Sequence, residues 1–167
     1  PGGSYIAWSG QYENQIRASE RLRIVVPIVL VIVVFFLYLT FRNLKASALV
    51  VLSIPFALIG GLLLQKALGY NFSVAVWVGY IALAGVAVET GVVMLVYLNE
   101  ALDQRLAQGP VTAVEIHDAT MEGAVFRLRP KLMTVAVDFI GLMPIMWSQG
   151  TGADVMRPLT APMIGGL

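Results

Sequence analysis

The sequence lacks cysteine and has little charge. The absence of cysteine from all 167 residues excludes disulfides and thiolate metal sites. Charged residues make up 13% of the chain, about half the share that is usual in a soluble domain, and 58% of the residues are hydrophobic. The net charge of +1 says little, because the position of charges matters more than their sum in a membrane protein. The composition therefore predicts an integral membrane protein.

Motifs for enzyme chemistry are missing as well. The chain has no Gly-Lys-Ser phosphate loop, no arrangement typical of a catalytic triad and no histidine-rich metal site. We therefore expect a secondary transporter driven by an ion gradient rather than an enzyme. We expect no catalytic residue, no bound cofactor and no nucleic-acid partner.

Five hydrophobic runs indicate an all-α bundle of transmembrane helices. A helix of about 20 residues crosses a hydrocarbon core about 30 Å thick, whereas strands of about 16 residues or more are improbable. The alternating pattern of a membrane β-barrel is also absent. The runs cover about Ile24–Phe41, Ala46–Leu68, Val74–Leu98 and Leu132–Trp147, and a fifth begins near Leu159.

The segments between these runs differ in character. Residues 1–23 are polar and form the entry to the first span, and residues 24–98 hold three transmembrane helices. Residues 99–130 are expected to be a loop with an amphipathic helix that leads into the fourth span, because apolar residues recur there at helical spacing. Residues 131–167 hold the fourth span, a turn and the start of a fifth span. The chain has no initiator methionine and stops within an apolar run, so we expect a piece of a longer protein.

Basic residues predict the orientation of the bundle. They gather in the connection between the first and second runs and in the connection between the third and fourth, namely Arg42, Lys45, Arg105, Arg127 and Arg129. Because cytoplasmic loops carry an excess of Lys and Arg, both connections are expected in the cytoplasm. The basic residues of the N-terminal segment conflict with this orientation. A large translocated domain before them would remove the conflict.

Glu89 is the most informative residue, because it lies inside an otherwise apolar span. An intramembrane carboxyl group is by default part of an ion or proton pathway with a nearby partner. Small residues around it, Gly85 and Gly91 among them, favour a central helix on which the carboxyl group is shielded from lipid. The alternative is a neutral Glu that only bonds to another helix. Thr90 beside it either supports a proton-bearing hydrogen bond or bonds back to its own helix.

Lys131 and Asp138 are the candidate partners of Glu89, and both lie on the fourth run. Lys131 opens this run, where it either reaches Glu89 or anchors the helix end at the interface. Asp138 follows seven residues later, two helical turns along the same face and near the membrane midplane. It is a second proton carrier, a partner for Lys131 or a protonated side chain bonded across the bundle.

Methionine is the remaining candidate ligand. Thioether sulfur suits monovalent copper or silver, although most of the seven methionines are expected only to fill space in the spans. Met156 differs, because it lies in a polar turn between the fourth and fifth runs.

Four strings together resemble one known family. They are GYIALAGVAVETGVVMLVYL (Gly79–Leu98), EGAVFRLRPKLMT (Glu122–Thr134), GTGADVMRP (Gly150–Pro158) and APMIGG (Ala161–Gly166). Their sequence and order are similar to those of the heavy-metal-efflux branch of the resistance-nodulation-division transporters. The resemblance covers essentially the whole chain and is greatest to the exporters of monovalent copper and silver.

The resemblance implies an architecture and a set of partners. The chain would hold the eighth to eleventh transmembrane helices and the start of the twelfth, after the tail of the second periplasmic domain (Ser9–Glu13). The whole protein would be a homotrimer in the inner membrane of a Gram-negative bacterium. It would export cations by antiport with protons, together with a periplasmic adaptor and an outer-membrane channel. The cargo would be Cu⁺ or Ag⁺.

The resemblance also implies roles for individual residues. Glu89 matches the acidic position of the proton relay, and Lys131 matches the lysine of that relay in the monovalent-metal exporters. Met156 matches a methionine proposed for the metal path, although Met163 is close enough in sequence to compete for this part. Asp138 stands where an aliphatic residue is expected, so it is either an extra proton carrier or within the variation of the family.

Two other function classes remain open. An exporter of drugs, lipids or divalent metals would use the same helices. A non-transport role, in which these helices are only a packing scaffold, would need none of the intramembrane charges.

Overall fold

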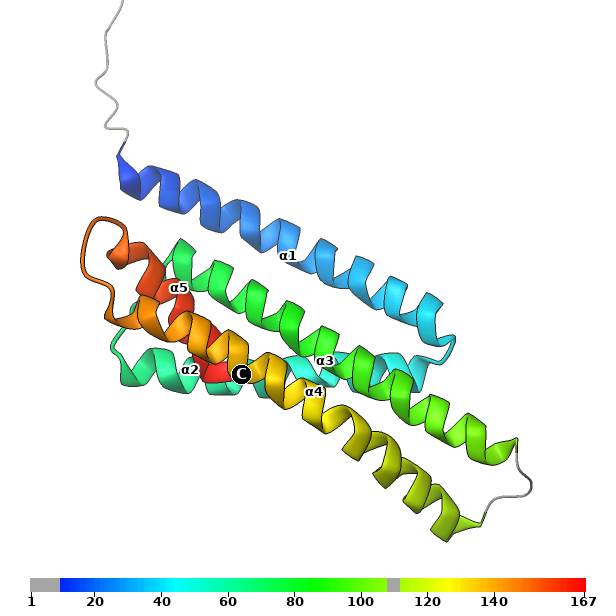
Figure 1. The fold of residues 1–167 in the computed structure, drawn as a ribbon. Coiled ribbons are helices and arrows are strands. Elements are labelled where there is room, and N and C mark those ends of the chain that lie inside the picture. Colours follow the sequence, from blue (N-terminus) through cyan, green and yellow to red (C-terminus); the bar gives the residue numbers. More distant parts are fainter. Residues whose placement is uncertain (1–9, 108–111) are drawn as a thin grey trace, which may run out of the picture.

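The computed structural model describes residues 10–107 and 112–167, and these residues form five helices without a β-strand (Figure 1). The helices are α1 (Gln11–Phe41), α2 (Leu44–Ala67), α3 (Val74–Leu106), α4 (Ala113–Trp147) and α5 (Ala153–Gly166). Four of them, α1 to α4, are long and apolar enough to cross a membrane. The prediction of an all-α membrane bundle is confirmed.

Successive helices run in opposite directions (Figure 1). The connection between α1 and α2 lies at one end of the bundle. The last residues of α3 and the first residues of α4 lie at the same end. We call this the basic end, because Arg42 and Arg105 belong to it. The short turns from α2 to α3 and from α4 to α5 lie at the opposite end. The two basic connections therefore share one end, as the loop charges predict.

Helix α3 occupies the centre of the bundle. Among the described helices it is the one that contacts all four others, whereas α1 contacts only α2 and α3 and runs along the outside (Figure 1). The prediction that the Glu89 helix is central is therefore met within these five helices. The buried core lies between α2, α3 and α5, where Val76, Leu83 and Thr160 are almost fully enclosed.

Glycines allow the closest helix contacts. A Cβ atom on Gly165 of α5 would lie 2.6 Å from the carbonyl oxygen of Gly60 on α2, so no larger residue fits there without a shift. Gly91 of α3 packs against Val50 of α2, where a Cβ atom would come within 3.1 Å of its side chain. Small residues that let backbones approach are the usual means of helix association in membranes, where water does not drive the helices together.

Several helices are longer than the hydrophobic runs. Helix α1 begins at Gln11, well before Ile24, and α3 continues beyond Leu98 to Leu106. Both extensions are polar but rich in good helix formers such as Ala, Leu, Glu, Gln and Arg, so hydropathy alone misses them.

The connection predicted at residues 99–130 is mostly helical. Helix α4 is continuous from Ala113 to Trp147, so the predicted amphipathic helix leads straight into the fourth span, as expected. At its start the backbone N–H of Thr112 donates a hydrogen bond of 2.7 Å to the Glu115 carboxylate. The fifth helix also begins earlier than predicted, at Ala153 rather than near Leu159, and carries Asp154 in its first turn. A carboxylate there interacts favourably with the helix dipole.

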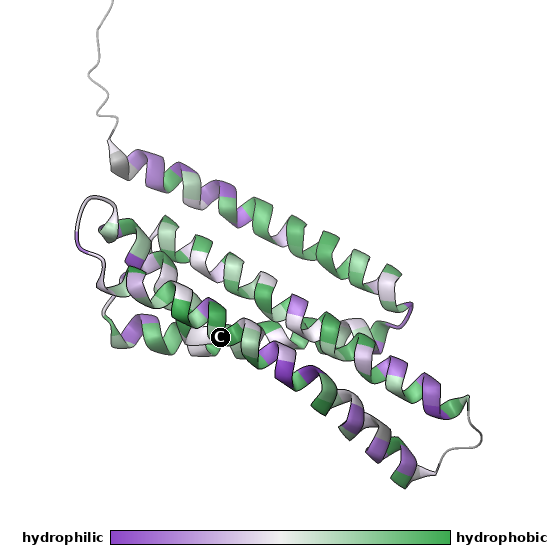
Figure 2. Ribbon diagram, in the orientation of Figure 1, coloured by the Kyte–Doolittle hydropathy of each residue, from purple (hydrophilic) through white to green (hydrophobic). Residues whose placement is uncertain are grey.

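The distribution of hydropathy fits a membrane. Hydrophobic residues fill the middle of the helices, and hydrophilic residues concentrate at the start of α1 and at the basic ends of α3 and α4 (Figure 2). Large apolar side chains point outward, with Phe56 72%, Val31 68% and Ile140 68% exposed. Such a surface is costly in water and suits contact with lipid or with further helices.

Candidate functional site

Helices α3 and α4 bring Glu89 and Lys131 to one small cavity. Its volume is about 50 Å³. It is lined by Glu89, Thr90, Val93 and Met94 from α3 and by Arg127, Pro130, Lys131 and Thr134 from α4. The antiparallel packing of the two helices produces this meeting, since the residues are far apart in sequence. Of the two roles considered for Lys131, reaching Glu89 or anchoring the helix at the interface, the structure places its side chain at the Glu89 cavity.

The carboxylate and the ammonium group share this cavity without a direct ion pair. No nitrogen of Lys131 lies within 4.0 Å of a Glu89 oxygen, and the ion pairs that lysine or arginine forms among the described residues are Arg17–Glu13 and Arg105–Glu122. The cavity exceeds the roughly 10–15 Å³ that one water molecule needs, and its walls are partly polar. The cavity is therefore large enough to hold a water molecule between the two side chains.

Glu89 is exposed in this chain, which corrects one expectation. The small neighbours on its central helix do not shield it, because it lies on a stripe of α3 that the other four helices leave uncovered. Ile81 and Gly85 belong to the same stripe, and a Cβ atom on Gly85 would meet nothing within 4 Å. An ionisable group in a membrane faces protein or water rather than lipid, so this stripe needs a cover from outside these five helices.

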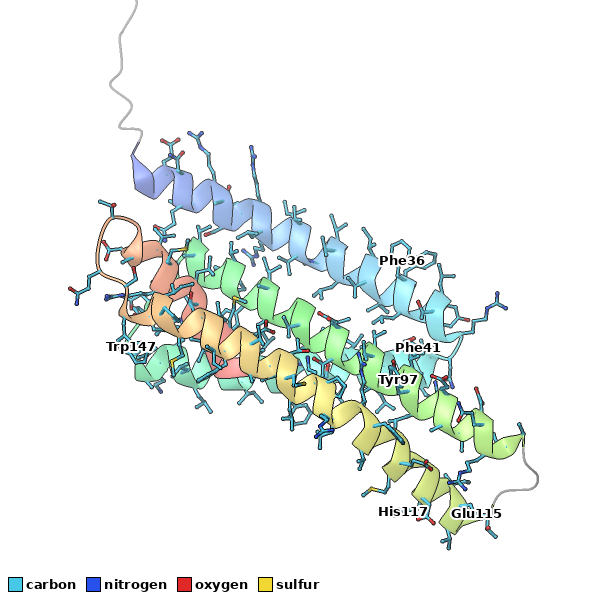
Figure 3. The ribbon with its side chains drawn as sticks, viewed as in Figure 1. Phe36, Phe41, Tyr97, Glu115, His117 and Trp147 are labelled. Atoms are coloured by element: carbon cyan, nitrogen blue, oxygen red, sulfur yellow. The ribbon has the colours of Figure 1, made fainter. Side chains whose placement is uncertain are left out.

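Arg127 and Thr134 belong to the cavity although we did not predict them. The guanidinium carbon of Arg127 lies 4.7 Å from the ring centroid of Tyr97 on α3, which fixes this cation over an aromatic face. Tyr97 lies where α3 and α4 run side by side (Figure 3). Helical spacing could have identified both residues, since Arg127, Lys131 and Thr134 are separated by four and three residues and share one face.

The Thr90 hydroxyl bonds back to its own helix. It donates a hydrogen bond of 2.7 Å to the carbonyl oxygen of Val86. Of the two roles considered for Thr90, the structure shows the hydrogen bond to its own helix. Thr90 still forms part of the cavity wall beside Glu89.

Lys131 also faces a second, larger cavity between α2, α3, α4 and α5. This central cavity has a volume of about 500 Å³. Thr90, Met94 and Lys131 line both cavities. Asp138 lines a third cavity of about 370 Å³, which holds Met163 but neither Glu89 nor Lys131. The structure therefore separates Asp138 from the Glu89 cavity by about one helical turn.

The two candidate methionines lie in different places. Met156 is 52% exposed near the start of α5, at the end of the bundle opposite the basic end, whereas Met163 lies deeper and lines the Asp138 cavity. Within residues 10–107 and 112–167, no three His, Cys, Asp or Glu side chains gather into a metal-binding group.

A further cavity, of about 660 Å³, lies at the basic end between α3 and α4. It contains the ion pair of Arg105 and Glu122, whose nearest atoms are 2.9 Å apart, and it shares Arg127 and Pro130 with the Glu89 cavity. Figure 3 shows Glu115 and His117 farther along α4 at this end and Trp147 at the other. Glu89 and Lys131 thus lie between this cavity at the basic end and the apolar middle of the bundle.

Comparison with known proteins identifies related sequences. The profile of the AcrB/AcrD/AcrF family matches residues 1–167. The chain is 47% identical to the cation efflux system protein CusA of Escherichia coli (strain K12), over 99% of the chain and 16% of that protein. It is 44% identical to the putative cation efflux system protein SilA of Salmonella typhimurium, with the same coverage.

More distant relatives and a solved structure agree with this result. The chain is 40% identical to the cobalt-zinc-cadmium resistance protein CzcA of Cupriavidus metallidurans, over 100% of the chain and 15% of that protein. An X-ray crystal structure of a heavy metal efflux pump superposes with a TM-score of 0.78 at 38% identity, covering 99% of this chain and 16% of the other. The chain therefore spans about one-sixth of the length of the relatives it matches.

Proposed function

The chain belongs to the AcrB/AcrD/AcrF family of resistance-nodulation-division transporters, and from this premise we propose that it is part of a proton-coupled exporter of heavy-metal cations. The whole protein would act as a secondary antiporter rather than an enzyme and would hold no resident cofactor. It would lie in the inner membrane of a Gram-negative bacterium as a homotrimer. A periplasmic adaptor and an outer-membrane channel would complete the export route.

One observation carries the proposal, namely that Glu89 and Lys131 line the same small cavity between α3 and α4, two helices long and apolar enough to cross a membrane. Opposite charges attract at short range, so a Glu89 carboxylate would draw the Lys131 ammonium group toward it. When a proton neutralises Glu89, that attraction is lost. The energy that holds α3 to α4 at this point therefore depends on whether Glu89 carries a proton.

This dependence supplies the coupling between protons and metal. With Glu89 ionised, Lys131 is drawn toward it and closes the cavity between α3 and α4. With Glu89 protonated, Lys131 is released toward the central cavity, which it also lines. Alternation between the two arrangements would shift the helices and drive the domains outside the membrane.

Monovalent copper or silver is the cargo that we propose. Lys131 and Met156 support it, since both match positions typical of the monovalent-metal exporters, and thioether sulfur prefers soft monovalent ions. Divalent cations are the second candidate, favoured by the 40% identity to a protein named for cobalt, zinc and cadmium resistance.

The experiment uses the full-length protein in liposomes loaded with metal, under an inward proton gradient. Silver and zinc efflux are compared for the unmodified protein and for Glu89→Gln and Lys131→Ala. We expect gradient-dependent silver efflux, lost in both variants, with a trimer of unchanged size. Normal efflux in both variants would show that these charges are structural, and zinc efflux without silver efflux would favour the second candidate.

A further inference from the structure

Asp138 is the intramembrane charge that the Glu89–Lys131 cavity leaves without a role. It is half-buried on α4 and lines the third cavity, whose other walls are apolar. These walls are formed by Leu83, Val86, Val137, Gly141, Leu142, Met163 and Leu167. Within the described residues, no cationic nitrogen lies within 4.0 Å of its carboxylate oxygens.

No charged group on the packed helices compensates Asp138 directly. On α3 the titratable side chains on either side of the cavity wall are Tyr80, three residues before Leu83, and Glu89, three residues after Val86, and neither lines the Asp138 cavity. On α4 the nearest titratable group is Lys131, two turns away. Helix α5 carries Asp154 and Arg157 near its start, outside the cavity wall. An ionisable side chain in apolar surroundings inside a membrane is costly, and such groups are by default candidates for an ion or proton pathway.

The cavities form a row that links Asp138 to the relay pair. The Glu89 cavity shares Thr90, Met94 and Lys131 with the central cavity. The central cavity in turn shares Leu83, Val86 and Leu167 with the Asp138 cavity. Each of the two larger cavities exceeds the space that one water molecule needs. Lys131 thus lies at one end of the row and Asp138 at the other.

We propose that Asp138 is a second proton-carrying group, placed in series with Glu89 and Lys131 and connected to them through the central cavity. This inference rests on the proposed function and adds a residue and a route to it. The proton leaves the Asp138 carboxyl group for cavity water and binds the Glu89 carboxylate. The Asp138 carboxylate then takes up the next proton from the end of the bundle opposite the basic end.

The test measures silver efflux by the full-length protein in liposomes under an inward proton gradient. Asp138→Asn keeps the shape of the side chain but cannot carry a proton, so efflux should fall by about tenfold or more. Asp138→Glu keeps the carboxyl group and should retain most of the efflux. Ile140→Val, a conservative change of an exposed residue on the same helix and outside the cavity wall, should leave efflux unchanged.

An infrared readout separates a proton carrier from a structural residue. The difference spectrum between acidic and basic pH should contain a carbonyl band of a protonated carboxyl group that disappears in Asp138→Asn and shifts in Asp138→Glu. Glu89→Gln should remove a different band. The number of silver ions bound, measured by calorimetry, should stay the same in Asp138→Asn.

Each contrary outcome overturns a definite part of the account. Wild-type efflux by Asp138→Asn while Glu89→Gln is inactive would overturn the role of Asp138 alone, whereas normal efflux by Glu89→Gln would overturn the proposed function. Loss of bound silver in Asp138→Asn without loss of an infrared band would make Asp138 a metal ligand instead. If Asp138→Asn does not assemble, an unshifted band in Asp138→Glu would overturn the proposal.

Discussion

At the scale of single residues, Lys131 has two possible roles at the Glu89 cavity, a fixed positive charge or a group that exchanges a proton. Its position does not distinguish them, but its chemistry does. A lysine can lose its proton when its surroundings disfavour the charge, whereas an arginine stays protonated. If Lys131 only supplies a fixed positive charge to the Glu89 cavity, an arginine should replace it. If it exchanges a proton with Glu89, an arginine should fail although the charge is kept.

We predict that Lys131→Arg lowers gradient-driven efflux nearly as far as Lys131→Ala does, because the guanidinium group cannot release its proton. The measurement is silver efflux from liposomes that contain the full-length variant. Lys45→Arg, an exposed change at the connection of α1 and α2, serves as the matched control and should be neutral. Full activity of Lys131→Arg would mean that only a fixed charge is needed.

Sequence reasoning found the ionisable residues of the site but not their full surroundings. Glu89, Lys131 and Asp138 stand out because charge is rare in apolar spans. The face of α3 on which α4 packs is set by long-range contacts, such as Gly123 of α4 against Tyr97 of α3. No local pattern of residues shows which face of α3 packs against α4, so the exposure of Glu89 could not be predicted.

At the scale of helices, the contact of α2 with α5 depends on glycine. A Cβ atom on Gly165 would meet both the Gly60 carbonyl oxygen and the Leu64 side chain at 2.6 Å. Neither neighbour can move far, because one is backbone and the other is held close to its helix. By contrast, a Cβ atom on Gly141 of α4 would meet nothing within 4 Å.

We predict that Gly165→Ala destabilises the protein by about 1–3 kcal/mol, the usual cost of overpacking. Gly141→Ala should be neutral or slightly stabilising, because Ala favours the helix and finds open space. Thermal unfolding of the detergent-solubilised full-length protein measures both. Equal melting temperatures for the two variants would contradict the close approach of α2 and α5.

Hydropathy predicted the existence and type of all five helices but not their ends. The spans are set by the cost of polar groups in lipid, which apolar runs record directly. The ends outside the membrane obey helix propensity and local contacts instead. The hydrogen bond between Arg105 and Glu122, for instance, ties the polar extension of α3 to that of α4. This explains why the connection predicted at residues 99–130 is mostly helical.

At the scale of the whole molecule, the placement of charge predicts the orientation in the membrane. Because this chain has no cysteine, single cysteines can be introduced here, with any in the remaining sequence of the full-length protein replaced. We predict that Lys45→Cys is protected from a membrane-impermeant maleimide in intact spheroplasts. Thr151→Cys, in the turn between α4 and α5, should be labelled. The reverse pattern would place the basic end outside and contradict the positive-inside assignment.

The central claim is that metal export by the full-length protein is driven by protons passing the Glu89 site. The most direct test records silver efflux and lumenal pH together in liposomes, with an inward proton gradient that an uncoupler collapses during the run. We predict that silver efflux and proton entry proceed together, stop together on collapse, and are both absent in Glu89→Gln. Silver efflux that continues after the collapse, or that Glu89→Gln leaves intact, would contradict the account.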